Sequence, residues 1–263
     1  MYLYTRMQGI FSGDLGFWIK LVLASIILRY VLLAGGSYFV FYVWKSERFF
    51  FRKIQQKYPD KESVLFEIKY STLTIVIFTV IVALLIHFSE LGYTARYNNI
   101  SDYGWIYFFL SMPLMVFIHD TYFYFTHRLL HWKPLYKIAH KTHHYVLNPT
   151  PFASFAFHPT EAIVNAGFLP LMVFFVPWHP IAMLAFLSFS IFFNVYGHMG
   201  YEFFSKKVVM HPVGKWMNTS THHNMHHTKV KYNFGLYFNV WDHLLGTNHP
   251  MYEATLEQVL DRK

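Results

Sequence analysis

Forty consecutive residues, from Ala162 to Tyr201, carry no formally charged side chain. A bilayer core of about 30 Å is crossed by roughly 20 helical residues, so this run is long enough for two spans. Pro177 and Pro180 interrupt it near the middle, where proline typically ends one helix and begins the next. The run therefore predicts a helical hairpin that begins and ends on the same side of a membrane.

Three further segments have the length and composition of membrane spans. Ser71 to Ser89 has no charged residue, and Tyr103 to His119 is uncharged and continues as an apparent helix. The segment from Phe17 to Trp44 contains Arg29 near its middle, where facing lipid would be costly, so this arginine is expected to face the bundle or the interface. Whether that segment crosses the bilayer is left open. We predict an all-α, multi-pass bundle of about four or five spans, forming a single membrane domain over residues 1–263.

Composition supports this class. Hydrophobic residues make up 54% of the chain and charged residues 14%, against about 25% charged in soluble domains. The net charge of +8 does not indicate nucleic acid binding, because the basic residues flank apolar runs and form no stripe with interleaved aromatics. The chain has no cysteine, so any metal must be held by nitrogen and oxygen donors.

The charge of one loop predicts the orientation. Lys45 to Tyr70 holds seven Lys and Arg residues against four acidic ones, which places it in the cytoplasm under the positive-inside rule. Counting spans from there puts every histidine cluster on the cytoplasmic side. We therefore expect a histidine-rich helical cap on the cytoplasmic face of a bacterial plasma membrane or an endoplasmic reticulum membrane.

Histidines are concentrated in one half of the chain, with fourteen of the seventeen between His119 and His227. Three clusters stand out, at 127 and 131, at 140, 143 and 144, and at 223, 226 and 227. Spacings of three and four residues bring imidazoles onto one helix face, and imidazole is a ligand for iron, zinc, copper and nickel. Eight histidines exceed the roughly four to six donors that one such ion accepts, so two ions are expected.

The return limb of the hairpin adds candidates, because Asn194 and His198 lie four residues apart at the same end. Asp120 shares a helix face with the first cluster, and Asp242 follows the last one. Both aspartates are expected to act behind the ligands, where a carboxylate orients metal-bound imidazole. The candidate metal ligands are His127, His131, His140, His143, His144, Asn194, His198, His222, His223, His226 and His227.

The donor set narrows the chemistry. A structural zinc site needs only four ligands, and hydrolytic two-metal centres need bridging carboxylates, which the clusters lack. Two ions with open positions at a membrane surface suit dioxygen activation, so we favour oxidation of a lipid C–H bond. A non-catalytic metal-binding or transport protein is the alternative from another class, but a transporter should carry its ligands near mid-bilayer rather than at helix ends.

The motifs resemble those of the sterol desaturase and fatty acid hydroxylase superfamily. The three histidine boxes of that superfamily correspond to His127–His131, His140–His144 and His223–His227, and Tyr232–Gly235 and Trp241–Asp242 are similar too. The resemblance covers about Phe117 to His249, so residues 117–249 are expected to form the catalytic region. Within the superfamily, Pro149–Ser154 and Ala156–Pro159 are most similar to sterol C-5 desaturases.

The resemblance implies two non-haem iron ions, dioxygen as co-substrate, and hydroxylation or desaturation of a sterol or fatty-acyl lipid. The sequence contains no dinucleotide-binding fingerprint, no cysteine cluster and no haem module, so electrons are expected from a separate b-type cytochrome, ferredoxin or reductase. Hydroxylation of a carotenoid or a sphingoid base remains an alternative, because it would use the same centre with a different pocket.

Overall fold

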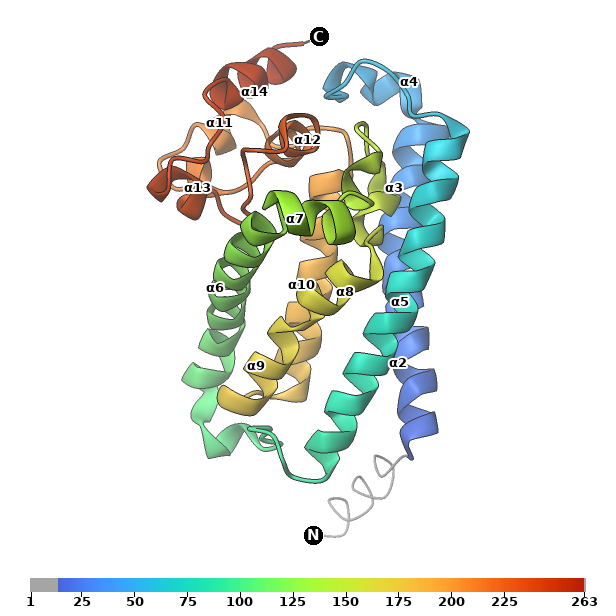
Figure 1. Cartoon of the computed structure of the whole chain (residues 1–263). Coiled ribbons are helices and arrows are strands. Elements are labelled where there is room, and N and C mark those ends of the chain that lie inside the picture. Colours follow the sequence, from blue (N-terminus) through green and yellow to red (C-terminus); the bar gives the residue numbers. More distant parts are fainter. Residues whose placement is uncertain (1–13, 263) are drawn as a thin grey trace.

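The computed structural model describes residues 14–262, and these are helical, with only isolated β-bridges between loops (Figure 1). Four rods are long and apolar enough to cross a membrane. The first runs without a break from Leu15 to Trp44 as α2 (Leu15–Tyr30), α3 (Gly36–Tyr38) and stretches of wider, π-type turns. The others are α5 (Lys61–Glu90), α6 (Gly104–Leu130) and α10 (Pro180–His198). The expected all-α membrane bundle is therefore confirmed.

Shorter helices connect and cover the rods. Two of them, α8 (Pro159–Ala166) and α9 (Phe168–Phe175), lie within the bundle beside α10. The remainder gather at one end of the molecule and form the cap (Figure 1). They are α4 (Ser46–Phe49), α7 (Lys133–Leu135), α11 (Lys206–Val209), α12 (Ser220–Lys229), α13 (Val240–Leu244) and α14 (Tyr252–Leu260). A cap at one end is thus observed, whereas its cytoplasmic location stays a prediction.

The ends of the rods follow from local sequence. The Asp60 carboxylate accepts a hydrogen bond from the backbone N–H of Ser63 at 2.7 Å and so caps the first turn of α5. Pro180 occupies the first turn of α10, where its missing N–H costs nothing. Leu32, Val76 and Ile106 are examples of the large apolar side chains exposed along the rods. Such surfaces suit contact with lipid, and the described chain is that of an integral membrane protein.

The first limb of the predicted hairpin differs from expectation. Instead of one full span it forms the two short helices α8 and α9, which meet at Gly167. The Tyr122 hydroxyl of α6 donates to the Val164 carbonyl at 2.6 Å, and the Gly167 N–H donates to the same carbonyl at 3.0 Å. A Cβ at position 167 would lie 2.6 Å from the Tyr122 oxygen, so glycine permits this close approach. The Gly167 N–H also donates to the Ile163 carbonyl at 3.0 Å, so the apolar helix continues almost without a break from Pro159 to Phe175, where it ends short of a full span.

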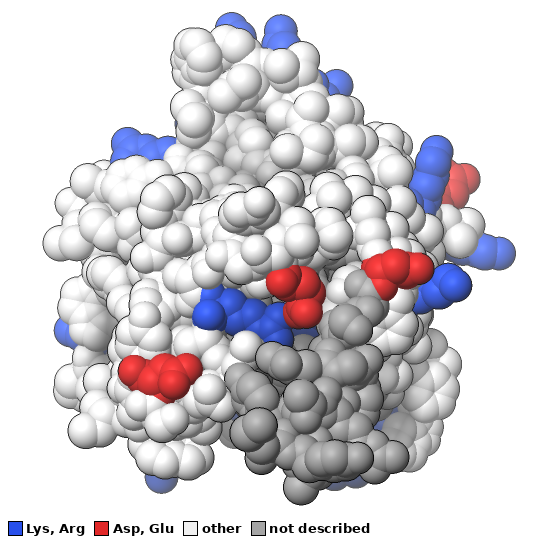
Figure 2. Space-filling model, turned by 90° about the horizontal axis from the view of Figure 1, so that it is seen from below, with Lys and Arg blue, Asp and Glu red and all other residues white. Residues whose placement is uncertain are grey.

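Two groups of packed side chains hold the rods together. One joins α2, α5 and α10 around Tyr30, Phe155 and Phe157, and the other joins α6, α9 and α10 around Phe168 and Phe186. Figure 2 looks along the rods from the end opposite the cap, where most of the visible surface is uncharged and acidic and basic groups are few. The described histidine motifs lie at the other end, where the rods meet the cap.

Candidate metal centre

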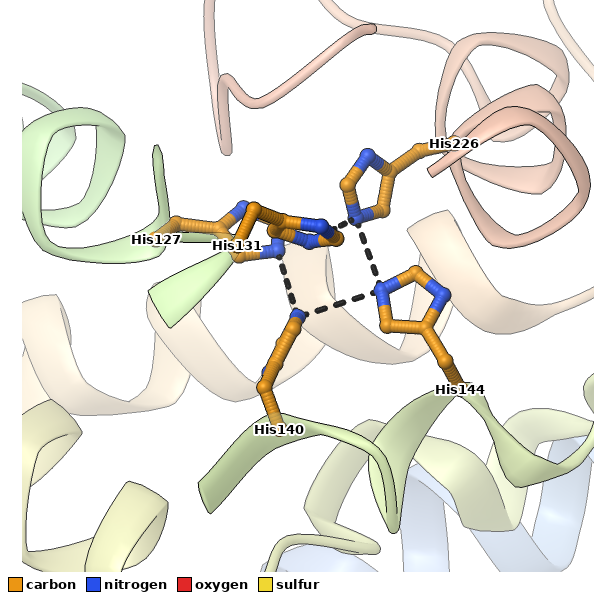
Figure 3. Close-up of side chains that lie close together, drawn as sticks. All are labelled: His127, His131, His140, His144 and His226. Atoms are coloured by element: carbon orange, nitrogen blue, oxygen red, sulfur yellow. Dashed lines mark hydrogen bonds between the residues drawn. The ribbon is translucent and has the colours of Figure 1, made fainter. Parts of the chain in front are cut away.

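Nine histidines converge at the junction between rods and cap, and they form two groups. The first group consists of His127, His131, His140, His144 and His226, which come from the end of α6, the segment after α7, and α12 (Figure 3). The second group consists of His143, His198, His223 and His227, which come from the same segment, the end of α10, and α12. Within each group, the potential ligand atoms lie within 4.8 Å of one another.

In the first group the Nε2 atoms point toward a common centre (Figure 3). The Nε2 atom of His140 lies 3.2 Å from that of His127 and 3.1 Å from that of His144. The Nε2 atom of His226 lies 3.0 Å from that of His144 and 3.1 Å from that of His131. Metal–nitrogen bonds of ~2.1 Å place neighbouring nitrogens of one coordination sphere roughly 3.0–3.4 Å apart. The nitrogen positions therefore fit a single ion.

The second group has the same spacing. The Nε2 atom of His198 lies 3.3 Å from that of His143 and 2.9 Å from that of His223. Neither ring nitrogen of His227 has a hydrogen-bond partner among the described residues, although the side chain is buried. Its ring centroid lies 4.7 Å from that of His143 and 4.9 Å from that of His144 in the first group. The two groups are therefore adjacent, as a dinuclear centre requires.

Burial keeps these imidazoles neutral. It lowers the pKa of His131 to about 2, and together with the neighbouring histidines it holds the pKa values of His140, His144 and His226 well below the usual range. In a cluster of neutral imidazoles, nitrogen lone pairs face one another, and there are too few N–H groups to donate a hydrogen bond to each of them. Because metal ions accept such lone pairs, the donor set fits two bound cations and has no simpler use.

The outward nitrogens show how the rings are oriented. The Nδ1 atoms of His127, His198 and His226 lie 2.9, 2.8 and 2.6 Å from backbone carbonyl oxygens. The Nδ1 atom of His140 lies 2.8 Å from a carboxylate oxygen of Glu161. An Nδ1–H donated to the three carbonyls leaves the Nε2 lone pair of each of those rings directed inward, whereas the His140 contact with Glu161 lacks hydrogen-bond geometry. The arrangement of the three rings is the one expected behind metal-bound histidine.

Glu161 was not among the residues that the sequence singled out. It lies in the first turn of α8, is 2% exposed, and packs against α6 and the second histidine box only in the folded chain. In the sequence, Glu161 stands out only as an acidic residue at the start of an apolar segment. It lies outside the three histidine clusters, so spacing does not connect it with the metal site. Burial raises the pKa of Glu161 well above its ordinary value, and the carboxyl group lies against the His140 ring.

The two aspartates that the sequence did single out are buried, but they do not touch the nine rings directly. Asp120 accepts hydrogen bonds from the backbone N–H groups of Tyr237 at 2.7 Å and Phe238 at 3.2 Å. Asp242 accepts from the N–H groups of Phe234 at 2.9 Å and Gly235 at 2.8 Å. They therefore hold in place the loop whose Phe234 carbonyl faces His127. Through this loop they position the ligand rings without contacting them.

Two predicted ligands lie outside both groups. The Nε2 atom of His222 faces Asn248 at 3.0 Å and Asp242 at 3.7 Å, because position 222 turns toward α13 while the rings of the last box turn inward. The side-chain nitrogen of Asn194 donates to the Ser154 carbonyl at 2.7 Å, and its backbone oxygen faces His198. His222 and Asn194 thus contact other partners in the structure, and their assignment as ligands stays a prediction.

A second buried carboxylate outside the sequence prediction organises α12. Glu202 accepts from the Thr221 N–H at 3.1 Å, from the Thr221 hydroxyl at 2.9 Å and from the Tyr196 hydroxyl at 2.8 Å. A carboxylate at a helix N-terminus satisfies free N–H groups and interacts favourably with the helix dipole. Glu202 therefore fixes the start of the helix that carries His223, His226 and His227.

A large internal cavity lies beneath the histidines. Its volume is about 1510 Å³, and it extends between the rods from the loop at residues 91–101 to the metal end. Its wall is mostly apolar and includes Phe123 and Phe157, whose ring centroids lie 4.9 Å from that of His127 and 5.1 Å from that of His143. An apolar molecule in this cavity would therefore lie close to both groups at one end, with these two phenyl rings between it and the histidines.

Comparison with known proteins places the chain among lipid-modifying sequences. The model of the family described as "Fatty acid hydroxylase" matches residues 112–247, close to the region in which the motif resemblance was found. A Delta(7)-sterol 5(6)-desaturase of Schizosaccharomyces pombe is 37% identical over 58% of this chain and 48% of its own length. Lathosterol oxidase of Rattus norvegicus is 35% identical over 60% of this chain and 52% of its own.

A longer but weaker match is lathosterol oxidase of Homo sapiens, which is 29% identical over 81% of this chain and 71% of its own length. The chain thus spans about half the length of the first two relatives. No solved structure is significantly similar to the chain.

Proposed function

Since this chain belongs to the fatty acid hydroxylase family, we propose that it is a di-iron membrane oxidoreductase that hydroxylates or desaturates a lipid with dioxygen. The observation that carries the proposal is the position of nine histidines, eight of them buried and His131 partly so, in two adjacent groups next to a large apolar cavity. Neither feature alone requires this chemistry, but together they bring redox-capable ions within reach of a lipid chain or ring.

Nine histidines are the proposed ligands. His127, His131, His140, His144 and His226 would hold one iron ion, and His143, His198, His223 and His227 the other. Bound there, the ions supply the activation of dioxygen that attack on an unactivated C–H bond requires. Five and four nitrogen donors leave open positions on ions that accept up to six, in contrast to a closed structural zinc site.

The remaining residues prepare the site for that chemistry. Glu161 lies against the His140 ring and would restrict its orientation, and Glu202 fixes the helix that brings in the last box. Phe123 and Phe157 form an apolar floor between the rings and the cavity, which excludes water and guides a hydrocarbon toward the centre. Burial of all these groups also keeps the reacting part of a lipid away from bulk solvent.

Hydroxylation and desaturation share the same balance of reagents. Hydroxylation inserts one oxygen atom into the C–H bond and releases one water. Desaturation removes two hydrogens and releases two waters. Each consumes one dioxygen, two protons and two electrons. We propose that a separate b-type cytochrome, ferredoxin or reductase delivers the electrons to the cap, on the cytoplasmic side of the membrane.

The lipid is proposed to be of sterol or fatty-acyl type. The relatives named as sterol desaturases and lathosterol oxidases support a sterol, and the large cavity can hold one. Hydroxylation of a carotenoid or a sphingoid base remains the second enzymatic candidate. A transport role is less well supported, because the histidines gather at one end of the rods rather than along a path through them.

The direct test combines metal analysis with lipid profiling. Purified chain should contain close to two irons and consume dioxygen when a reductant and a lipid are supplied. Mass spectrometry of cells that carry the wild-type chain should show a lipid that gains one oxygen or loses two hydrogens relative to cells carrying His143→Ala. Iron binding without dioxygen uptake, given a competent reductant, would refute the enzymatic proposal and favour a metal-binding protein.

A further inference from the structure

The wall of the cavity contains an arginine whose hydrogen-bonding capacity is incompletely used. The Nε atom of Arg29 donates to the Ser25 carbonyl of the preceding turn at 3.1 Å, which fixes the direction of the side chain. One terminal nitrogen, Nη1, is buried and has no acceptor among the described residues. Arg29 and Ser25 both line the cavity. The expected orientation of Arg29 toward the bundle is therefore observed, and it raises the question of what the guanidinium binds.

No acidic side chain of the cavity wall is free to neutralise this charge. The wall contains one carboxylate, that of Glu90, and it is already paired with Arg96, which also donates to the Asn98 side chain at 2.9 Å. The residues around Arg29 in the wall are largely apolar, such as Val22, Ile26 and Phe78. A buried donor without an acceptor costs free energy, and more so when it is charged. A bound molecule with an oxygen acceptor would remove that cost.

The position of Arg29 along the cavity specifies which part of a ligand it would contact. On α6 the cavity wall ends at Phe123, one turn before His127, and on α10 it ends at Asn194, one turn before His198. On α2, which runs toward the same end in Figure 1, the wall ends at Arg29. The next residue, Tyr30, stacks on Phe155 of the wall at 5.3 Å between ring centroids. Arg29 therefore lies at the metal end of the cavity.

We propose that Arg29 anchors the polar head group of the lipid substrate by donating to its oxygen acceptor, so that the head and the oxidised carbon lie at the same end of the cavity. This inference rests on the proposed function and adds a substrate class to it. The class is a lipid with a hydroxyl or carboxylate head whose reacting carbon is close to that head, and whose hydrocarbon remainder extends along the apolar wall toward residues 91–101. A lipid oxidised far from its head group does not fit this arrangement.

The experiment measures lipid affinity without turnover. Iron-loaded protein in detergent is kept free of dioxygen, and the Kd is measured for four radiolabelled lipids. These are the 3β-hydroxysterol cholestanol, its head-less analogue cholestane, stearic acid and its methyl ester. The observable is the ratio of affinities between each parent lipid and its analogue, because this ratio isolates the head group from the hydrocarbon. We expect Arg29→Leu to lower the affinity for one parent lipid about ten- to hundredfold and to leave that of its analogue nearly unchanged.

Two conservative variants distinguish the sources of the acceptor. If the head is a hydroxyl, Arg29→Gln and Arg29→Lys both retain most of the sterol ratio, because both still donate a hydrogen bond. If the head is a carboxylate, Arg29→Lys retains the fatty acid ratio and Arg29→Gln loses it, because charge dominates the interaction. Should Arg29→Leu fail to fold, Arg29→Met takes its place, because methionine has a long unbranched side chain that donates no hydrogen bond.

Arg96→Leu is the matched control, since it removes the other arginine of the cavity wall, whose partners are already present. It should leave both ratios unchanged. Wild-type ratios for both lipid pairs in a folded variant that cannot donate, Arg29→Leu or Arg29→Met, overturn the anchor, as does a wild-type protein that binds the analogues as tightly as the parents. An anchor that behaves as expected in a protein lacking dioxygen-dependent oxidation would instead refute the proposed function alone.

Discussion

Glu161 and His140 form the contact that joins the bundle to the candidate metal centre, with a carboxylate oxygen 2.8 Å from the ring Nδ1 atom and both side chains buried. The two residues belong to different elements. Glu161 lies in α8, and His140 is the last residue of the π-type turn Tyr136–His140, where the second histidine cluster begins. Because α8 also packs against α5 and α6, this contact couples the position of a ligand ring to the packing of the rods.

Replacing Glu161 should weaken one metal site in particular. Glu161→Ala removes the carboxyl group that lies behind His140, and loss of a group behind a metal-bound imidazole typically lowers metal affinity or activity about 10–100-fold. Glu161→Gln retains an acceptor oxygen and should be intermediate. Iron titration with a competing chelator measures the effect. Glu47→Gln, at an exposed position, serves as the control, and equal iron affinity in Glu161→Ala and wild type would contradict the assigned role.

Loss of a ligand from the second group should be visible in stoichiometry. His143→Ala removes one of four donors, so iron content should fall from near two toward one per chain and oxidation should stop. Membrane insertion should persist, because the apolar rods remain. Elemental analysis of purified protein makes the measurement, with His211→Ala at an exposed position as the control. Two irons in His143→Ala would show that this histidine is not a ligand.

The loop that faces His127 should depend on Asp242. Asp242→Ala leaves the buried N–H groups of Phe234 and Gly235 and the hydroxyl of Thr247 without their acceptor. We expect the free energy of unfolding to fall by about 2–5 kcal/mol, since each buried donor left unpaired costs about 1–3 kcal/mol. Thermal unfolding in detergent tests this. Asp261→Ala breaks only an exposed ion pair with Lys206 and should change the stability by less than about 1 kcal/mol.

Lys53 should make stability rise with pH. Its side chain is buried among the rings of Tyr42, Tyr58 and Tyr201, and burial lowers its pKa from 10.5 to about 8. Between these two values the unfolded chain binds more protons than the folded one, so the free energy of unfolding increases as pH rises from about 8 to 10.5. The full change is about 3 kcal/mol.

Lys53→Met keeps the volume of the side chain and removes the titrating group. The Tm of wild type should therefore rise relative to that of this variant as pH increases from 8 to 10, measured by thermal unfolding at matched ionic strength. Parallel pH profiles for the two proteins would show that Lys53 does not carry this dependence. Comparing the two profiles removes the contributions of tyrosines that titrate in the same range.

The orientation of the cap can be measured without removing native thiols, because the chain has no cysteine. Lys207→Cys places a thiol at an exposed position of the cap, and Tyr93→Cys places one in the loop at the opposite end. In intact cells a membrane-impermeant maleimide should label Tyr93→Cys alone, and permeabilised cells should show both. The reverse pattern would place the histidine groups outside the cytoplasm.

Much of the metal centre follows from local spacing. In each of three pairs, His127 with His131, His140 with His144, and His223 with His227, the members are four residues apart and share a group. Four residues complete roughly one turn, so the sequence alone brings the members of each pair together. The apolar runs likewise determine that the chain forms long helices, because a bilayer demands that length and composition.

Only the tertiary structure decides how the pairs combine. His226 belongs to the first group, whereas His223 and His227 of the same cluster belong to the second. His143 belongs to the second group, whereas His140 and His144 belong to the first. The members of a cluster separate because neighbours in sequence point in different directions around a turn. Glu161 comes close to His140 through the packing of α8, and Tyr122 of α6 donates to the Val164 carbonyl of the same helix. The spacing of residues within one helix determines the direction in which each side chain points. The distance between side chains on separate elements depends on how those elements pack together, and the sequence of a single segment does not determine that.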